Sequence, residues 1–389
     1  MGGNMNQAFI LQGWDIVTYL PTPSRGVPEE VRKQYKTKKY SNEITDDGHH
    51  VMHRFSMYKE GQNPILRALR YFFCTIKHFN RGVFAKDARQ CDVMFIYSTP
   101  PIQGAMAAMV KKFRRELKFV YNLQDIFPDS MAGTGLSRKG GVLWKIGRMI
   151  ENFTYRNADK IIVIFQDFKR NIMAKGVPEE KIEVIYNWVD QNAVVEIPRE
   201  QNKLFDMYGL DRSKFYITYN GNIGLTQNME MLTEVARELE STYPDIHIVL
   251  VGNGAYRETL VSKLREMCEE QHKKAPDGTE AITFGNITLL PFQPYEDIAH
   301  VFSLGNVSLV ISKPGVGENS VPSKTWSIMS ASRPVLANFD ENELKEIVSD
   351  HHCGIFTKAG DKEAFKEAIL TLYGNPELCK EYGKNGVGL

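Results

Sequence analysis

The chain has 389 residues, of which 42% are apolar, and this is enough to bury the cores of two domains. Its 48 Lys and Arg residues are balanced by 47 Asp and Glu residues, which argues against a general nucleic-acid-binding protein. The five cysteines are scattered without a Cys-x-x-Cys pair, so the sequence predicts neither a disulfide framework nor a zinc site, and a reducing cytosol fits best. No apolar run approaches the length of a membrane span, and no secretory signal is recognised.

The first 50 residues contain a helix-like stretch after Gly2 and Gly3, a strand over 13–20 and a long polar excursion over 21–50. A further strand is expected over 51–55. Three histidines lie close together here: His49, His50 and His53. Because no carboxylate or cysteine stands at ligand spacing from them, we interpret them as exposed loop histidines and not as metal ligands.

Residues 65–118 hold eleven Lys or Arg residues against three acidic ones, with aromatic residues interleaved. At helical spacing, Leu66, Leu69, Phe73, Ile76 and Phe79 form one apolar face. The pattern leaves two interpretations open. The face packs on the core, as in an ordinary amphipathic helix, or it docks on an anionic membrane surface.

The next strand, Cys91–Ser98, is followed by a helix over 102–115 and a strand over 118–123. Directly after this strand comes Asp125, in the sequence Gln-Asp-Ile-Phe-Pro-Asp. The carboxyl end of a parallel strand is where α/β proteins bind ligands, so Asp125 is a candidate catalytic residue. The alternative is an aspartate that only caps its loop. Helices over 141–155 and 168–175, a strand over 157–164 and the stretch 181–190 complete a first domain, 1–192.

The second domain, 200–389, repeats this strand and helix alternation. Phe215–Asn220 is a strand that runs into the turn Gly221-Asn-Ile-Gly224, and a helix follows from about residue 228. A second strand, 246–251, ends in Gly252-Asn-Gly254, and a third, 287–292, ends before Gln293-Pro294. Alternating apolar strands and helices predict a parallel sheet covered by helices. The expected fold class is α/β, with two Rossmann-like domains facing across a cleft.

One stretch of the second domain, residues 305–336, contains a strand (307–311), a loop with Gly315 and Gly317, a helix opened by Pro322 and the start of another strand. The backbone N–H groups at such a helix start, with Ser320, Ser323 and Lys324 beside them, predict a phosphate or diphosphate site. The alternative is an ordinary helix start on the surface. No Gly-x-x-x-x-Gly-Lys-Ser/Thr or Gly-x-Ser-x-Gly motif is present, which disfavours P-loop and hydrolase chemistry.

The stretch Ser-Val-Pro-Ser-Lys-Thr-Trp-Ser-Ile-Met-Ser-Ala-Ser-Arg-Pro-Val-Leu-Ala resembles the donor-binding stretch of bacterial glycosyltransferases of family 4, in the branch that builds surface polysaccharides such as colanic acid, capsule and O-antigen. The resemblance covers residues 85–375 well and the first 80 loosely. It implies the two-domain GT-B architecture, with an acceptor-binding first domain and a nucleotide-sugar-binding second domain. The family's opening strand is missing from this chain, and Trp14 stands where His is usual.

The resemblance also implies roles for particular residues. On the acceptor side it implies Gly2, Gly3 and Asp129, with Asp125 as the catalytic residue. For the donor it implies Gly221, Asn222, Gly224, Gln227, Gly252, Gly254, Phe292, Gln293, Glu318, Ser320, Val321, Pro322, Ser323 and Lys324.

Several residues depart from the family's pattern. The superfamily's Arg/Lys pair on the first loop of the second domain is replaced by Asn222 and Gln227. The second Glu of its donor motif is replaced by Ser327, and Ser332 stands where Gly normally precedes Arg-Pro. Lys324 is therefore expected to carry more of the phosphate charge than is usual.

The resemblance, together with the absence of an Asp-x-Asp motif, implies a retaining, metal-independent hexosyltransferase that moves a sugar from a nucleotide-diphosphate sugar, UDP-linked by expectation, to a lipid-linked or glycan acceptor. No cofactor is expected, because no Asp-x-Asp motif is present to hold a metal with the donor. The expected location is the cytoplasm, with peripheral attachment to the inner face of the membrane. Two alternatives stay open: a sugar-nucleotide epimerase of the same fold, and a catalytically inactive partner subunit.

Overall fold

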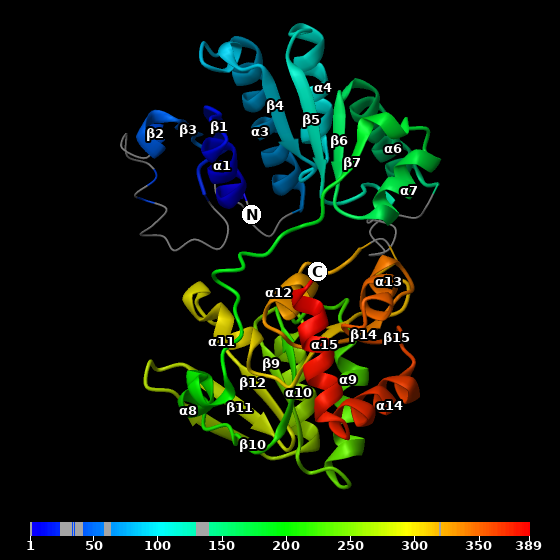
Figure 1. The fold of residues 1–389 in the computed structure, drawn as a ribbon. Helices are drawn as coiled ribbons and strands as arrows, with labels where there is room; N and C mark the ends of the chain where they lie inside the picture. Colours follow the sequence, from blue (N-terminus) through cyan, green and yellow to red (C-terminus); the bar gives the residue numbers. More distant parts are fainter. Residues whose placement is uncertain are drawn as a thin grey trace. The chain divides into compact units, whose positions relative to one another are not determined.

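A computed structural model describes residues 2–23, 33, 35, 42–57, 64–129, 140–318 and 320–389 of the protein. The chain divides into two compact units. The N-terminal unit contains most of the described residues up to Ile185, and the C-terminal unit contains Tyr186–Leu389 together with Phe165–Asp167. Both units are α/β structures built around parallel strands (Figure 1).

The N-terminal unit contains, in chain order, α1 (Gly2–Leu11), β1 (Ile16–Pro21), β2 (Asn42–Thr45), β3 (His50–Phe55), α3 (Pro64–Phe84), β4 (Val93–Tyr97), α4 (Ile102–Phe113), β5 (Lys118–Leu123), α6 (Val142–Asn157), β6 (Lys160–Val163), α7 (Gln166–Ala174) and β7 (Ile182–Val184). Among the described residues its strands form two sheets, in the orders β1-β3-β2 and β4-β5-β6-β7. The second sheet is parallel throughout. The strands of the N-terminal unit are thus divided between two sheets among the described residues.

Strand β4 is covered on both faces because its side chains alternate. Met94 and Ile96 pack against a cluster that α3 and α4 contribute to. Phe95, on the other face, lies 6.0 Å from the ring of Phe9 in α1, and the hydroxyl of Tyr97 donates to the sulfur of Met5 in the same helix. Apolar residues on both faces of a strand are typical of a parallel sheet with helices on either side.

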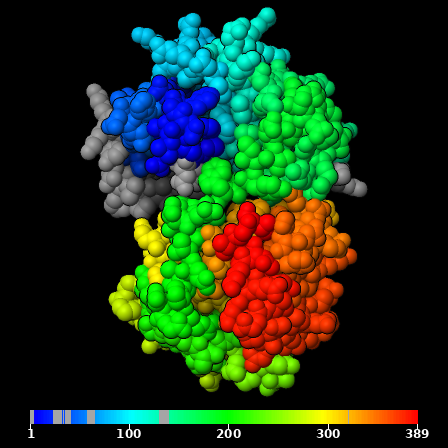
Figure 2. Space-filling model, in the orientation of Figure 1, coloured from blue at the N-terminus to red at the C-terminus, as the bar shows by residue number. Residues whose placement is uncertain are grey.

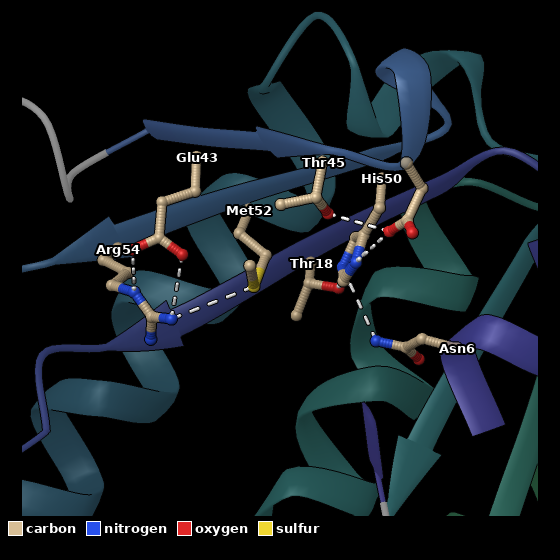
Figure 3. Close-up of polar contacts among 8 residues, drawn as sticks. Asn6, Thr18, Glu43, Thr45, His50, Met52 and Arg54 are labelled. Atoms are coloured by element: carbon tan, nitrogen blue, oxygen red, sulfur yellow. Dashed lines mark hydrogen bonds and ion pairs between the residues drawn. The ribbon is translucent and has the colours of Figure 1, made fainter. Parts of the chain in front are cut away.

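His49 is an exposed turn residue, as the sequence predicts, but His50 and His53 are not loop residues, so our interpretation is wrong for these two. His50 and His53 belong to β3, and His50 is only 7% exposed. Nε2 of His50 lies 2.9 Å from the hydroxyl of Thr18 in β1 and 3.5 Å from the side-chain nitrogen of Asn6 in α1 (Figure 3). This histidine therefore connects three elements of the unit.

The C-terminal unit contains α8 (Lys203–Tyr208), β8 (Phe215–Asn220), α9 (Met229–Glu240), β9 (Ile246–Val251), α10 (Arg257–Met267), β10 (Glu270–Lys274), β11 (Glu280–Phe284), β12 (Ile287–Leu290), α11 (Ile298–Phe302), β13 (Val307–Ile311), α12 (Lys324–Ser330), β14 (Val335–Phe339), α13 (Glu343–Asp350), β15 (Gly354–Lys358), α14 (Lys362–Tyr373) and α15 (Pro376–Val387). Its strands form one sheet in the order β10-β11-β12-β9-β8-β13-β14-β15. The six strands from β12 to β15 are parallel, and the antiparallel edge strands β10 and β11 are an addition that the sequence analysis missed.

Two apolar clusters cover the two faces of this sheet. One contains residues of α9, α10 and α14, and the other contains residues of α8 and α11. Every residue of β8, β9, β13 and β14 is buried between them. The last two helices, α14 and α15, reach the surface of the unit (red in Figure 2). This doubly covered parallel sheet explains why its strands read as short, nearly continuous apolar runs.

The order of the strands also predicts where a ligand binds. From β8 the chain moves outward to β9 and β12, and it then returns to β13 on the other side of β8. In open α/β sheets the crevice for a ligand lies at the carboxyl ends of the strands where the order reverses in this way. In this unit that point lies between β8 and β13.

Candidate functional site: a cavity at the switch point of the C-terminal sheet

A cavity of about 280 Å³ lies at this switch point. It is lined by Tyr219, Asn222, Thr226, Gln227, Val310, Ile311, Ser312, Val316, Gly317, Ser320, Pro322, Lys324 and Phe339. Five of these were predicted from the sequence as donor-binding residues: Asn222, Gln227, Ser320, Pro322 and Lys324. The lining residues come from the ends of β8, β13 and β14 and the loops that follow them, as the strand order requires.

The turn after β8 forms the floor of this site and depends on glycine. Gly221 has φ +133° and Gly252, after β9, has φ +142°, and residues other than glycine rarely adopt such φ values. A Cβ atom on Gly252 would lie 2.0 Å from the carbonyl oxygen of Gly221, and one on Gly254 would lie 2.2 Å from that of Ile223. The Gly252–Gly254 turn therefore packs closely against the backbone of the Gly221–Gly224 turn. Neither Gly252 nor Gly254 lines the cavity.

Within the first turn, two side chains fix the backbone. The amide of Gly224 donates to Oε1 of Gln227 at 3.0 Å, and the hydroxyl of Tyr219 donates to the carbonyl oxygen of Asn222 at 2.7 Å. Asn222 and Gln227 are the residues that replace the superfamily's Arg/Lys pair. Gln227 thus has a defined role in this turn, which is to hold it closed.

Lys324 is the cation of the cavity wall. Its Nζ lies 3.5 Å from the centroid of the Tyr219 ring, and burial lowers the pKa of its ammonium to about 7. Among the described residues Nζ has neither an ion pair nor a hydrogen bond. An ammonium stacked on an aromatic ring retains some stabilisation of its charge, but it lacks a counter-ion.

The loop between β13 and α12 is held in place by two residues that follow β14. The carboxylate of Asp340 accepts hydrogen bonds from the amides of Gly315 (2.9 Å) and Gly317 (2.7 Å). The side-chain nitrogen of Asn342 donates to the carbonyl oxygens of Gly317 and Ser320, both at 2.8 Å. Glycine is required at 317 because a Cβ atom there would lie 2.4 Å from the ring of Phe339. The backbone amides of Gly315 and Gly317 are therefore engaged by the carboxylate of Asp340.

The helix after this loop begins later than the sequence predicts. Pro322 does not open it: α12 starts at Lys324, with Ser323 as the preceding cap residue, and it is only seven residues long. The amide of Thr325 donates to the carbonyl oxygen of Pro322. Any contact with an anion here therefore depends on the side chain of Lys324 and on the backbone over 320–323.

Ser312 and Tyr219 are site residues that sequence reasoning missed. Ser312 directly follows β13, is 4% exposed and lines the cavity, and its hydroxyl has no hydrogen-bond partner among the described residues. An unpaired buried hydroxyl beside a cavity is suited to bind a polar ligand, because leaving it unsatisfied is costly. The rule that ligands lie at the carboxyl ends of strands would have pointed to Ser312 and Tyr219.

The remaining predicted donor residues lie outside the cavity lining: Gly221, Gly224, Gly252, Gly254, Phe292, Gln293, Glu318, Val321 and Ser323. Phe292 is 75% exposed. Gln293 is buried, and its side-chain nitrogen donates to the hydroxyl of Tyr208 and to the carbonyl oxygen of Pro291, each at 2.9 Å. Gln293 therefore supports its own loop.

In the N-terminal unit, Asp125 lies where the sequence predicts, just past the carboxyl end of β5, and it is exposed. The loop is anchored by Ser98, whose hydroxyl oxygen accepts the amides of Gln124 (3.0 Å) and Asp125 (3.2 Å). Gly2 and Gly3, predicted on the acceptor side, open helix α1 and do not form a loop.

Asp129 belongs to an ion-pair network. Its Oδ2 lies 2.7 Å from Nζ of Lys175, which also lies 2.9 Å from Oε1 of the buried Glu151. Glu151 in turn accepts from Tyr155 and pairs with Arg148. Burial of its phenol and the nearby Glu151 carboxylate raise the pKa of Tyr155 well above its usual value. Asp129 thus stabilises the packing of α6 and α7, whatever else it contacts.

The apolar face predicted on α3 is exposed over its first half, so the core-facing interpretation is wrong there. Leu66, Leu69, Phe73 and Ile76 are 40–51% exposed. Phe79, the last residue of the predicted face, packs on the core cluster of the unit instead.

No helix of the described residues is long and apolar enough to cross a membrane. No group of three or more His, Cys, Asp or Glu residues in the same part of the chain is placed to hold a metal ion.

Comparison with protein families decides what kind of protein this is. Residues 7–188 match the model of the glycosyl transferase 4-like domain, and residues 200–387 match that of glycosyl transferases group 1. The chain belongs to the glycosyltransferases.

Among relatives of this glycosyltransferase, putative glycosyltransferase EpsD of Bacillus subtilis is 28% identical over 190 residues, 49% of this chain and 44% of the relative. Putative colanic acid biosynthesis glycosyl transferase WcaI of Escherichia coli is 25% identical over 214 residues, 54% of this chain and 48% of the relative. The matched regions therefore span about half the length of these curated relatives.

The solved structure of HepE from Anabaena in complex with UDP is similar to this glycosyltransferase over 96% of this chain and 93% of its own, with a TM-score of 0.65 and 16% identity. At this identity the likeness shows the fold alone. It confirms the predicted α/β architecture of two Rossmann-like domains of the GT-B type.

Proposed function

We propose that this glycosyltransferase is a retaining, hexose-transferring enzyme that takes a sugar from a UDP-linked donor and passes it to a lipid-linked or glycan acceptor in cell-surface polysaccharide synthesis. The observation that carries the proposal is the cavity at the switch point of the C-terminal sheet, with Lys324 in its wall. A nucleotide-diphosphate sugar suits this cavity because its phosphates supply a negative charge to pair with the ammonium of Lys324.

The donor's diphosphate would lie against Lys324 and the backbone over 320–323. The hydroxyl of Ser312 and the amides of Asn222 and Gln227 offer further hydrogen-bonding groups in the same cavity. A uridine nucleotide is proposed because the similar structure of HepE contains UDP. Surface polysaccharide synthesis is proposed because the name of WcaI refers to colanic acid biosynthesis.

On the acceptor side, Asp125 would orient the attacking hydroxyl. In a retaining transfer the acceptor oxygen forms the new bond to the anomeric carbon as the bond to the diphosphate breaks, and the leaving diphosphate takes the hydroxyl proton on the same face. An ordinary aspartate is too weak a base to deprotonate a sugar hydroxyl on its own, so orientation through a hydrogen bond is the role that its acidity allows.

The enzyme would need no cofactor or metal, because helix termini and Lys324 can neutralise the phosphate charge.

The enzyme would also attach to the cytoplasmic face of the membrane through α3. That helix exposes Leu66, Leu69, Phe73 and Ile76, and Lys77 and Arg81, also exposed, lie on the same helix. Apolar side chains next to basic ones are the combination that binds an anionic bilayer surface.

The proposal is tested with UDP-sugars incubated with the enzyme, with and without a lipid extract and with and without excess EDTA. Sugar transfer to lipid that survives EDTA supports it. Conversion of one UDP-sugar to another without acceptor would instead indicate the epimerase, and no turnover of any donor would indicate an inactive subunit. Loss of turnover with EDTA that magnesium or manganese restores would overturn the metal-free mechanism.

A further inference from the structure

Tyr219 contacts both parts of the donor site. It is the penultimate residue of β8 and only 1% exposed. Its ring lies under Nζ of Lys324, 3.5 Å from ring centroid to nitrogen, and its hydroxyl donates to the carbonyl oxygen of Asn222 at 2.7 Å. A Cβ atom on Gly221, the first residue of the turn, would lie 3.7 Å from the same Nζ, so the ammonium also lies beside the start of the turn. One side chain thus sets the position of the ammonium relative to the turn.

In the part of the chain that the structure describes, no acidic side chain forms an ion pair with Lys324. The charged groups on the neighbouring segments are Lys313, Glu318 and Asp340. Lys313 pairs with Glu230, the carboxylate of Asp340 holds two loop amides, and Glu318 is exposed. None of them pairs with Lys324, and the phenol of Tyr219 is neutral because burial raises its pKa. Among the described residues, the aromatic ring is therefore the only group in contact with the ammonium that stabilises its charge.

We propose that Tyr219 is a positioning residue of the donor site, which holds the ammonium of Lys324 against the Gly221–Gly224 turn, and that the donor diphosphate binds there together with a proton. The inference rests on the proposed function, because it needs Lys324 to bind the diphosphate. It adds the residue that positions Lys324 and the coupling of donor binding to pH.

The direction of the coupling follows from the charge of Lys324. Burial lowers the pKa of its ammonium to about 7, so below pH 7 the empty site is already charged and binding takes up no proton. Above pH 7 the empty site is neutral. A bound diphosphate supplies the missing counter-charge and favours the ammonium, so binding then takes up about one proton, and affinity falls about tenfold per pH unit.

The test is isothermal titration calorimetry of the full chain with UDP between pH 7 and 9, in buffers of different ionisation enthalpy. The terminal phosphate of UDP titrates near pH 6, by analogy with other phosphate monoesters, and so stays ionised across this range. ADP and GDP are titrated alongside. The variants are Lys324→Ala, Tyr219→Phe and Tyr219→Leu, with a thermal melt of each as the control for folding.

For the wild type we expect uptake of about one proton at pH 8.5 and a dissociation constant that rises about tenfold from pH 7.5 to 8.5. Tyr219→Phe keeps the ring, so its pH profile should match the wild type while its affinity falls a few-fold. Tyr219→Leu removes the ring and so lowers the pKa of Lys324 further, and its affinity should already fall about tenfold per pH unit at pH 7, where the wild type has only begun to lose affinity. A merely structural role for Tyr219 would lower stability without moving this profile.

The outcomes separate the two proposals. Unchanged binding in a folded Lys324→Ala variant, or no binding of any of the three nucleotides at pH 7, would overturn the proposed donor site and this inference with it. Weaker binding in Lys324→Ala, combined with no proton uptake by the wild type, would overturn the inference alone. If Tyr219→Leu does not fold, the proton uptake of the wild type and of Tyr219→Phe decides whether this inference holds.

Discussion

The carboxylate of Asp340 accepts the amide of Gly317 at 2.7 Å, and this bond links the end of β14 to the loop that lines the candidate donor site. Its other oxygen accepts the amide of Gly315 at 2.9 Å. A carboxylate bound to two amides of a glycine loop occupies a position that an anionic ligand could otherwise take. The amides of Gly315 and Gly317 are therefore engaged within the loop, and Lys324 is a cation that lines the cavity.

Replacing Asp340 with Asn should loosen this loop, because an amide oxygen can accept only one of the two hydrogen bonds and the NH₂ group opposes the other amide. A hydrogen bond to a charged group contributes about 1.5–3 kcal/mol, so UDP binding should weaken roughly tenfold. Hydrogen exchange of the amides around 315–317 should accelerate. Glu341→Gln, which alters only an exposed neighbour paired with Lys345, is the matched control. Unchanged exchange and unchanged affinity would show that Asp340 does not position the loop.

Asp125→Asn should reduce sugar transfer substantially and leave UDP binding nearly unchanged. Asn alters the charge and hydrogen-bonding pattern that orient the acceptor hydroxyl, and orientation can be worth several kcal/mol of the barrier. Turnover and the dissociation constant of UDP are measured in parallel. Asp92→Asn, an exposed aspartate just before β4, is the matched control. Near wild-type turnover by Asp125→Asn would support the loop-capping alternative, and a glycosyl adduct trapped on Asp125 would refute the orienting role by making it a nucleophile.

The exposed face of α3 should bind anionic vesicles at low salt and release them at high salt. Each Lys or Arg near an anionic bilayer contributes about 1 kcal/mol, and salt screens that attraction. Flotation with vesicles that contain phosphatidylserine measures the binding. The double change Leu69→Ser and Phe73→Ser should abolish it with little effect on folding, because both side chains are nearly half exposed.

The control for this experiment is Met267→Ser, which removes a side chain of similar exposure at the end of α10 in the other unit. Equal flotation of the double variant and the wild type would exclude α3 as the docking surface. Failure of the wild type to float at any salt concentration would remove the membrane from the proposal.

Ser332→Gly should stabilise the protein. Ser332 adopts φ +54°, in the left-handed region, at the position where the resembled family has Gly before Arg-Pro. A residue with a side chain costs about 1–2 kcal/mol there, although the greater freedom of Gly in the unfolded chain offsets part of the gain. The melting temperature should therefore rise by a few degrees. A lower melting temperature would mean that the Ser332 side chain contributes more than the strain costs.

The sequence by itself determined the fold class and the strands that position the candidate site. Strands such as Phe215–Asn220 and Val307–Ile311 were predicted to the residue, because strands buried on both faces of a parallel sheet are continuous apolar runs. Glycine turns after β8 and β9, and a carboxylate after β5, were found for the same reason: ligand-site residues of α/β proteins follow their strands directly. The start of α12 was placed two residues early, because Pro322 is acceptable in the turn before a helix as well as inside it.

Only the tertiary structure decided what each side chain does. Asp125 and Asp129 look alike in the sequence, but Asp129 is paired with Lys175, a residue 46 positions away, whereas Asp125 is exposed. Burial lowers the pKa of the Lys324 ammonium, and the Tyr219 ring that contacts it comes from a segment about a hundred residues earlier in the chain. The exposed apolar face of α3 has the same helical periodicity as a buried one. Periodicity and spacing record local geometry, whereas charge, burial and hydrogen bonding depend on which distant segments the fold brings together.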